Sequence, residues 1–181
     1  RSATVHAQTW PSKPIRMVLT ISGGGETNAR VVMDRVSQAL GQPIVVDAQA
    51  GAGGAVGATQ VARAAADGYT LLYGTNGAMT LRRFLIKDMP YDTLKDFVPL
   101  ARIGEATSAI AATNGLPVSS ISELIEYARK NPGKVNYGTP GIGTTHHLSG
   151  VLIEQMTGIR MVHVPYKNAP QSVTDLVAGR V

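Results

Sequence analysis

The chain contains no cysteine in its 181 residues. Disulfide bonds, thiolate metal sites and cysteine nucleophiles are therefore all excluded, and the composition suits an oxidising compartment where a stray thiol is a hazard. Aromatic residues are also scarce, at 5% of the chain, so few side chains are available to stack on nucleic-acid bases. No stretch approaches the roughly 18 consecutive apolar residues that a membrane-spanning helix needs.

Charged residues are few as well, at 16% of the chain, although lysine and arginine outnumber the acidic residues and give a net charge of +5. The basic residues are scattered and form no basic block, so we do not expect nucleic acid as a partner. A small acidic molecule remains open as a partner. With 44% hydrophobic residues, the chain can bury a core in one large domain or two small ones.

The first residues lack an initiator methionine and end in small side chains. The segment Val5-His6-Ala7 before Gln8 is typical of the end of a secretory signal whose apolar region has been removed. We therefore interpret residues 1–9 as the remnant of a signal or of a tag.

Three glycine-rich loops each follow a β-prone run and precede a predicted helix, at residues 22–28, 51–57 and 138–147. The first four N–H groups of a helix have no intrahelical partner and lie at the positive end of the helix dipole. A carboxylate or phosphate group is therefore a suitable ligand at such a helix start. The chain is therefore predicted to hold something small and negatively charged, although the glycines of the middle loop best fit a packing role.

The first half alternates predicted strands and helices. Apolar runs predict strands at residues 15–21, 43–46 and 69–73. Helical spacing predicts one helix that ends at Leu40 and is capped by Thr27 or Asn28, and a second at about 56–65. This alternation is typical of a doubly wound parallel sheet. We assign residues 10–101 to a first α/β domain.

In the second half, the same alternation of predicted strands and helices resumes after a segment that lacks it. Two strand-like runs at 97–103 and 108–113 are the predicted crossover between domains. The elements predicted after them are a helix at 121–130, a strand at 135–138, a helix from 144 to about 156, a strand at 161–164 and a last helix opened by Asn168 and Pro170. We assign residues 102–181 to a partial second α/β domain.

Motifs for catalysis or cofactor binding are missing. The loop at 51–57 lacks the third glycine of the dinucleotide fingerprint, no loop carries the Gly-Lys-Ser/Thr of a P-loop, and there is no Gly-x-Ser-x-Gly elbow. His146 and His147 are adjacent, so on a helix their side chains point about 100° apart and are poorly placed to bind one metal ion together. We predict no catalytic residue, no metal site, no cofactor and no enzyme activity.

Short motifs recur in one order along the chain. They lie at residues 13–16, 24–27, 51–54, 67–72, 116–118, 132–137, 143–148 and 162–167. By these motifs, which run from about Trp10 to Val181, the sequence closely resembles the periplasmic solute-binding proteins of tripartite tricarboxylate transporters, the Bug receptors. The resemblance is specific because many ordered motifs agree.

The resemblance implies an α/β, periplasmic-binding-protein-like fold of two doubly wound domains joined by a hinge. It implies that the domains close over a small carboxylated solute and present it to the membrane permease subunits without chemistry. The solute classes are di- and tricarboxylates, acidic amino acids and aromatic acids. The implied location is the periplasm, reached through a cleaved signal peptide.

In such receptors, backbone N–H groups and hydroxyls hold a solute carboxylate. The matching positions in this sequence are Gly24, Gly25, Thr27, Thr75, Asn76, Gly77, Gly143, Thr144 and Thr145, with His147 nearby. The argument from helix starts independently selects the first and last groups of these positions.

The sequence departs from the family at Glu26 and Asn28, where relatives usually carry a small residue and an aspartate. Glu26 would repel a carboxylate if it faced the cleft. Family members are also longer, so the rest of the second domain and the segment that returns to complete the first are expected to be absent after Val181. A chain that ends there is expected to expose apolar sheet edge, which favours self-association.

Two other functions stay open at this level. A small α/β enzyme acting on a carboxylated metabolite would use His147 as acid or base, and its mark would be a buried histidine paired to a carboxylate in the cleft. A truncated non-binding or interaction protein would show a collapsed cleft and a large self-association surface. The sequence favours the receptor.

Overall fold

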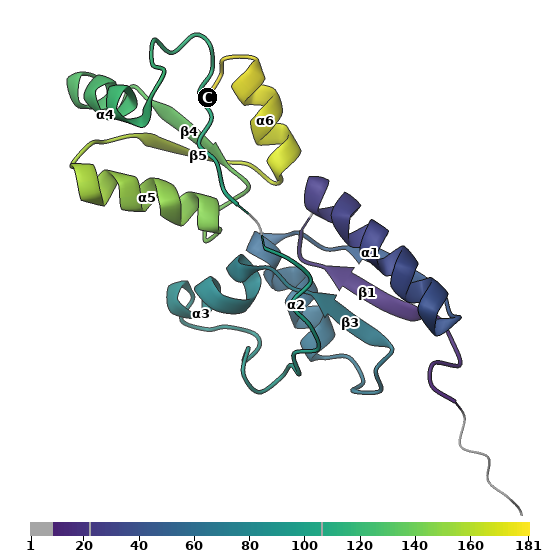
Figure 1. Ribbon diagram of the computed structural model, residues 1–181. Helices are drawn as coiled ribbons and strands as arrows, with labels where there is room; N and C mark the ends of the chain where they lie inside the picture. Colours follow the sequence, from purple (N-terminus) through teal and green to yellow (C-terminus); the bar gives the residue numbers. More distant parts are fainter. Residues whose placement is uncertain (1–8, 22, 106) are drawn as a thin grey trace, which may run out of the picture.

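The computed structural model describes residues 9–21, 23–105 and 107–181. They form two separate parallel sheets in two lobes (Figure 1). The first sheet contains β1 (Ile15–Leu19), β2 (Ile44–Ala48) and β3 (Thr70–Tyr73), in the order β2-β1-β3. The second sheet pairs β4 (Asn136–Thr139) with β5 (Val162–Pro165). Of the predicted signal or tag remnant, residues 1–8 lie outside the described residues.

Helices cover both faces of the first sheet. Successive side chains of a strand point to opposite faces, and Leu19 of β1 belongs to a buried cluster with Ala29 of α1 (Gly24–Leu40). The next side chain on β1, Val18, faces the other way, where a Cβ added at Gly57 of α2 (Ala55–Ala62) would meet it at 3.1 Å. This is the doubly wound arrangement that the alternation of strands and helices predicts.

The second sheet has one buried apolar cluster beside α4 (Ile121–Lys130). Its members are Leu124, Ala128, Val135 and Ile159. α5 (Thr145–Thr157) connects β4 to β5 and comes so close to the sheet that a Cβ added at Gly150 would collide with the ring of Tyr137. α6 (Ala169–Val177) follows β5. The helices and strands predicted here are present, with boundaries that move by one or two residues.

The predicted strands at 97–103 and 108–113 are wrong, because both runs lack regular secondary structure. A strand needs a neighbour that takes up its backbone N–H and C=O groups. Neither run pairs with either sheet. Their apolar side chains, such as Val98 and Ile110, are exposed instead of covered.

Three short helical segments of the first half are absent from the sequence prediction. They are a 3-10 turn η1 (Ala52–Gly54), a π-helical turn η2 (Gly77–Leu81) and α3 (Arg82–Leu85). Glycine-rich loops give no apolar periodicity from which such short turns can be predicted. Within the described ranges, the helices are too short or too polar for any of them to cross a membrane.

Candidate functional site

The loops that carry the predicted site residues all leave the carboxyl ends of parallel strands. In open α/β sheets this edge is where ligands bind. One loop follows β1, residues 74–76 follow β3, and residues 140–144 follow β4. Loops of one sheet meet loops of the other at a place that we call the junction, defined by Gly23, Gly53, Gly77, Gly143 and Pro170.

α1 begins earlier than the sequence predicts. Gly23 is its N-terminal cap at a φ of 72°, which favours glycine, and its carbonyl accepts the N–H of Thr27 at 3.2 Å. No side chain caps the helix, so the predicted cap by Thr27 or Asn28 is wrong. Gly24 and Gly25 are the first two helical residues, and the side chain of Thr27 is exposed.

Glu26, the acidic residue of this first turn, is paired within its own helix. Its Oε1 atom accepts hydrogen bonds from Nη2 and Nε of Arg30 at 2.7 and 3.1 Å. The two residues are four positions apart, which places them on the same face of the helix. The negative charge that would repel a carboxylate is therefore compensated locally.

Thr20 ties the loop after β3 to the end of β1. Its buried hydroxyl lies 3.1 Å from the carbonyl oxygen of Tyr73 and accepts the N–H of Thr75 at 3.1 Å. These bonds fix the chain just before the exposed Asn76 and the buried Gly77. Sequence reasoning missed Thr20, although a hydroxyl at the end of an apolar run was a signal that the strand end has a polar partner.

The third glycine loop is held by its own side chains. Thr144 caps α5, because its hydroxyl donates to the carbonyl of Gly141 at 2.8 Å and accepts the N–H of His147 at 3.3 Å. The single proton of this hydroxyl is therefore already in use. The N–H groups of Thr145 and His146 lie in the first turn of α5, where no intrahelical acceptor exists.

The structure brings the second and third groups of predicted residues together. A Cβ added at Gly77 would lie 3.6 Å from the carbonyl oxygen of Gly143 and 3.8 Å from the Cα of Thr144. The first group meets the other lobe at a different part of the junction, since a Cβ added at Gly23, the residue before this group, would lie 2.8 Å from the ring of Pro170. At Gly23 the contact is too close for a Cβ, whereas at Gly77 the distances are those of ordinary van der Waals contact.

His147 faces a second histidine. The ring centroids of His147 and His163 are 4.3 Å apart, and Tyr137 stacks on His163 at 4.9 Å. The Nε2 atom of His163 lies 2.6 Å from the hydroxyl of Thr139, which is buried. Burial, followed by the neighbouring charge of His147, lowers the pKa of His163 below its ordinary value of 6.5.

The histidines are not arranged for metal binding. In the part of the chain that the structure describes, no group of three or more histidine, aspartate or glutamate side chains is placed to hold a metal ion. His147 accepts the N–H of Gly143 on its Nδ1 atom at 3.4 Å, and its ring therefore supports the third loop. Hydrogen-bond donors at helix starts are suited to an anion.

Arg82, which sequence reasoning did not single out, also lies at the junction. Its Nη1 atom would be 2.9 Å from a Cβ added at Gly53 and 3.7 Å from one added at Gly143. Its Nε atom is buried and has no hydrogen-bond partner among the described residues. In the sequence, Arg82 is followed by the similar Arg83, and no local signal distinguishes the two.

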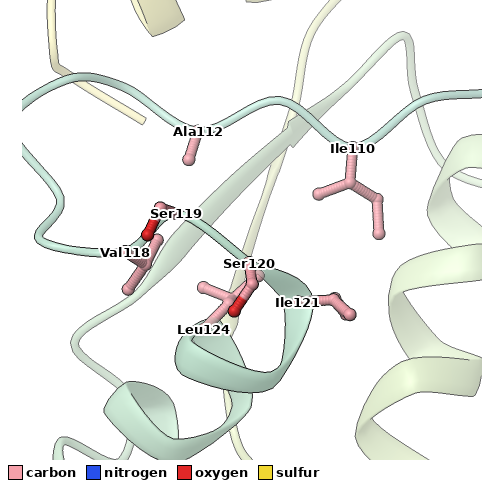
Figure 2. A pocket seen from close by; sticks show the side chains of 7 residues that line it. All are labelled: Ile110, Ala112, Val118, Ser119, Ser120, Ile121 and Leu124. Carbon is pink, nitrogen blue, oxygen red and sulfur yellow. The ribbon is translucent and has the colours of Figure 1, made fainter.

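A hollow of about 340 Å³ lies away from these residues, between the chain at Ile110 and Ala112 and the start of α4 (Figure 2). Its serines are already occupied. Ser120 accepts the N–H of Glu123 at 3.2 Å, and Ser119 donates its N–H and hydroxyl to the Glu123 carboxylate at 2.7 and 2.8 Å. These bonds from Ser119 hold the pKa of Glu123 below its usual value. The lining carries no positively charged side chain, and Ser120 already caps the start of α4, so we place the candidate site at the junction.

Comparison with known proteins gives a consistent result. A protein-family model described as the tripartite tricarboxylate transporter family receptor matches residues 28–181. A UPF0065 protein of Bordetella bronchiseptica is 41% identical over 177 residues, which cover 97% of this chain and 52% of that protein.

Solved structures show the same likeness. An R. palustris protein solved with adipate shares 37% sequence identity, with a TM-score of 0.90 over 95% of this chain and 58% of that one. The periplasmic binding protein BugD shares 32% identity, with a TM-score of 0.79 over the same shares of the two chains. These likenesses confirm the predicted fold class, the α/β fold of periplasmic solute-binding proteins.

The chain spans about half the length of the curated relatives it matches. The family consists of solute-binding receptors and not of enzymes. The family match covers most of the chain, and the relatives and the solved structures agree with it. The chain belongs to the receptor family of the tripartite tricarboxylate transporters.

Proposed function

We propose that this chain captures a small carboxylate in the periplasm, as the receptor of a tripartite tricarboxylate transporter. The observation that carries the proposal is the meeting of Gly77 with Gly143 and Thr144, where loops from both sheets bring backbone groups to one junction. The relative solved with adipate supports a carboxylate as the solute. Family membership supports delivery of the solute to membrane permease subunits.

Backbone N–H groups do most of the binding in this proposal. Those of Thr145 and His146 at the start of α5, and of Gly24 and Gly25 at the start of α1, lie at the positive ends of helix dipoles. A carboxylate gains about 1.5–3 kcal/mol from each hydrogen bond that its charge strengthens. Thr144 shapes the loop through its cap. The other predicted site residues retained in the proposal are Thr27, Thr75, Asn76, Gly77, Gly143 and His147.

The division into domains at 10–101 and 102–181, with closure about a hinge, belongs to the same proposal. Each sheet has its own buried apolar cluster, which supports two separate bodies. The runs at 97–103 and 108–113 pair with neither sheet. A connection without sheet pairing is suited to absorb the change in backbone angles that closure requires.

We propose neither catalysis nor a cofactor at this site. His147, the residue that an enzyme would use as acid or base, packs on His163 and accepts a backbone N–H from Gly143. In the described residues no carboxylate is hydrogen-bonded to either ring, so the orienting partner of a general base is not provided there. Secretion through a cleaved signal peptide completes the proposal, supported by the periplasmic relative BugD.

Self-association is also proposed. Leu94, Val98 and Leu100 are 72%, 83% and 76% exposed, and they lie close together in the sequence. Exposed apolar side chains that gather on a surface are commonly covered by another polypeptide. Light scattering over a range of protein concentrations measures the expected rise in mass.

Isothermal titration calorimetry of the chain with adipate, citrate, aspartate and benzoate tests the receptor function. We expect at least one of these acids to bind, and the Thr145→Ala variant to bind it about tenfold more weakly, since a hydroxyl at the start of α5 is lost. Ser149→Ala is the matched control, because Ser149 is exposed one turn further along the same helix. Absence of binding to all four acids would contradict the proposal.

A further inference from the structure

Arg82 is a cation without a counter-ion. Among the described residues its guanidinium takes part in none of the ion pairs and its Nε atom is both buried and unpaired. Four other arginines have carboxylate partners, Arg16 with Asp47, Arg30 with Glu26, Arg102 with Glu105 and Arg180 with Asp175. The arginines that likewise take part in none of the ion pairs of the described residues are Arg35, Arg63, Arg83, Arg129 and Arg160. All of these arginines are exposed, whereas Arg82 is half-buried. Withdrawing a charge from water without a partner is unfavourable, so this position calls for an explanation.

The position of the guanidinium provides one. Nη1 of Arg82, which comes from the first lobe, lies where a Cβ added at Gly143 of the second lobe would be 3.7 Å away. On its own lobe the same atom would be only 2.9 Å from a Cβ added at Gly53. Both neighbours are glycines with positive φ, 60° at Gly53 and 80° at Gly143, so neither of these two positions places a side chain on the guanidinium.

The backbone that carries Arg82 is also unusual. The N–H of Arg82 donates to the carbonyl of Gly77, five residues earlier, which closes a π-helical turn. Turns of this kind are rare and occur frequently at functional sites. This turn starts at the glycine that meets Gly143 and Thr144 and ends at the arginine. The π-helical turn therefore connects the glycine that contacts the second lobe with the arginine at the junction.

We propose that Arg82 pairs with a carboxylate of the solute and makes this receptor selective for dicarboxylates over monocarboxylates. The inference rests on the proposed function. Backbone N–H groups at helix starts carry partial charges and suffice for one carboxylate. The second negative charge of a dianion needs a full positive charge, and a guanidinium presents a planar fork of donors that matches a carboxylate.

Matched pairs of acids test this selectivity by isothermal titration calorimetry. The pairs are adipate with hexanoate, succinate with butyrate, and terephthalate with 4-methylbenzoate, so that each pair differs by one carboxylate on a similar skeleton. The unmodified chain is expected to bind at least one diacid more than about tenfold tighter than its partner. The Arg82→Gln variant is expected to lose about 10- to 100-fold in affinity for that diacid and little for the monoacid.

Arg83→Gln is the matched control, because Arg83 is the next residue, is exposed and lies over the ring of Phe84. It is expected to bind both acids as the unmodified chain does. Circular dichroism checks the fold of each variant. If Arg82→Gln does not fold, Arg82→Lys carries the test, since it keeps the charge but loses the fork and is expected to weaken the diacid alone.

The outcomes separate this inference from the function on which it rests. Binding of a diacid that is unaffected by Arg82→Gln, or by Arg82→Lys where the lysine variant has to be used, overturns the role of Arg82 and leaves the receptor standing. Equal affinity of the unmodified chain for both acids of every pair also overturns the selectivity. If none of the six acids binds but citrate, aspartate or benzoate does, the dicarboxylate selectivity is overturned and the receptor stands. If none of these nine acids binds to the unmodified chain, the proposed function itself is overturned.

Discussion

The two sheets bury different kinds of side chain at their centres. In the first, Ile15, Val18 and Leu19 of β1 are all 0% exposed. In the second, the large side chain that is most completely buried is Thr139, at 2%, and it is hydrogen-bonded to His163. The first lobe is therefore stabilised mainly by apolar burial, which does not depend on pH, while the second depends in part on a polar contact that does.

Replacing one core leucine in each lobe is the strongest test of this difference between the two cores. Leu19→Ala is expected to lower the free energy of unfolding by about 3–5 kcal/mol, because a fully buried side chain leaves a cavity in a sheet covered on both faces. Leu124→Ala, at the 9% exposed Leu124 of the second lobe, is the matched change and is expected to cost less, about 2–3 kcal/mol.

Urea unfolding followed by tryptophan fluorescence measures both leucine variants. Trp10 is the single tryptophan and packs beside Tyr69, at 6.0 Å between ring centroids, so it reports on the first lobe. Circular dichroism reports on both lobes together. Equal losses from the two substitutions would mean that the two cores contribute alike.

The polar contact of the second lobe is tested by Thr139→Val, which keeps the volume and removes the hydroxyl. The expected loss is about 1–3 kcal/mol, because Nε2 of the partly buried His163 would lose its partner at 2.6 Å. Thr139→Ser keeps the hydroxyl and is the control. A stability of the valine variant equal to that of the unmodified chain would show that the hydrogen bond contributes nothing net.

The pH dependence sharpens the comparison and has the smallest expected effect. The pKa of His163 is lowered in the folded chain, chiefly by burial, so below about pH 6.5 the unfolded chain binds a proton that the folded chain excludes. Stability is expected to be complete above pH 6.5 and to fall as the pH drops toward the lowered folded-state pKa. Urea midpoints between pH 7.5 and 5.0 measure this, and His163→Gln is expected to flatten the curve. An unchanged slope in that variant would assign the effect to another group.

How much the sequence revealed depended on how local the signal was. The central strand was predicted at 15–21 and is observed at Ile15–Leu19, because a continuous apolar run closed by glycine is a local pattern. The runs at 97–103 and 108–113 carry the same pattern but are not strands, since strand formation depends on a partner elsewhere in the chain.

The same limit applies to the candidate site. Glycine loops before helices predicted the first and last groups of backbone donors, and the family resemblance supplied the second; the structure brings the second and third groups together. Thr20 and Arg82 were missed because their contacts are distant in sequence, as in the separation of 55 positions between Thr20 and Thr75. Arg82 is distinguished by burial without a charged partner. The residues around it in the sequence give no sign of this property.

The π-helical turn Gly77–Leu81 holds one residue more than an α turn would. A π turn spans five residues from acceptor to donor where an α turn spans four. Deleting one residue from this turn would let the N–H of Arg82 bond the same carbonyl of Gly77 in an α turn, so the side chains within the turn would change direction and Arg82 would keep its place. The position of the arginine is therefore insensitive to the gain or loss of this one residue, whereas the residues between it and Gly77 are not.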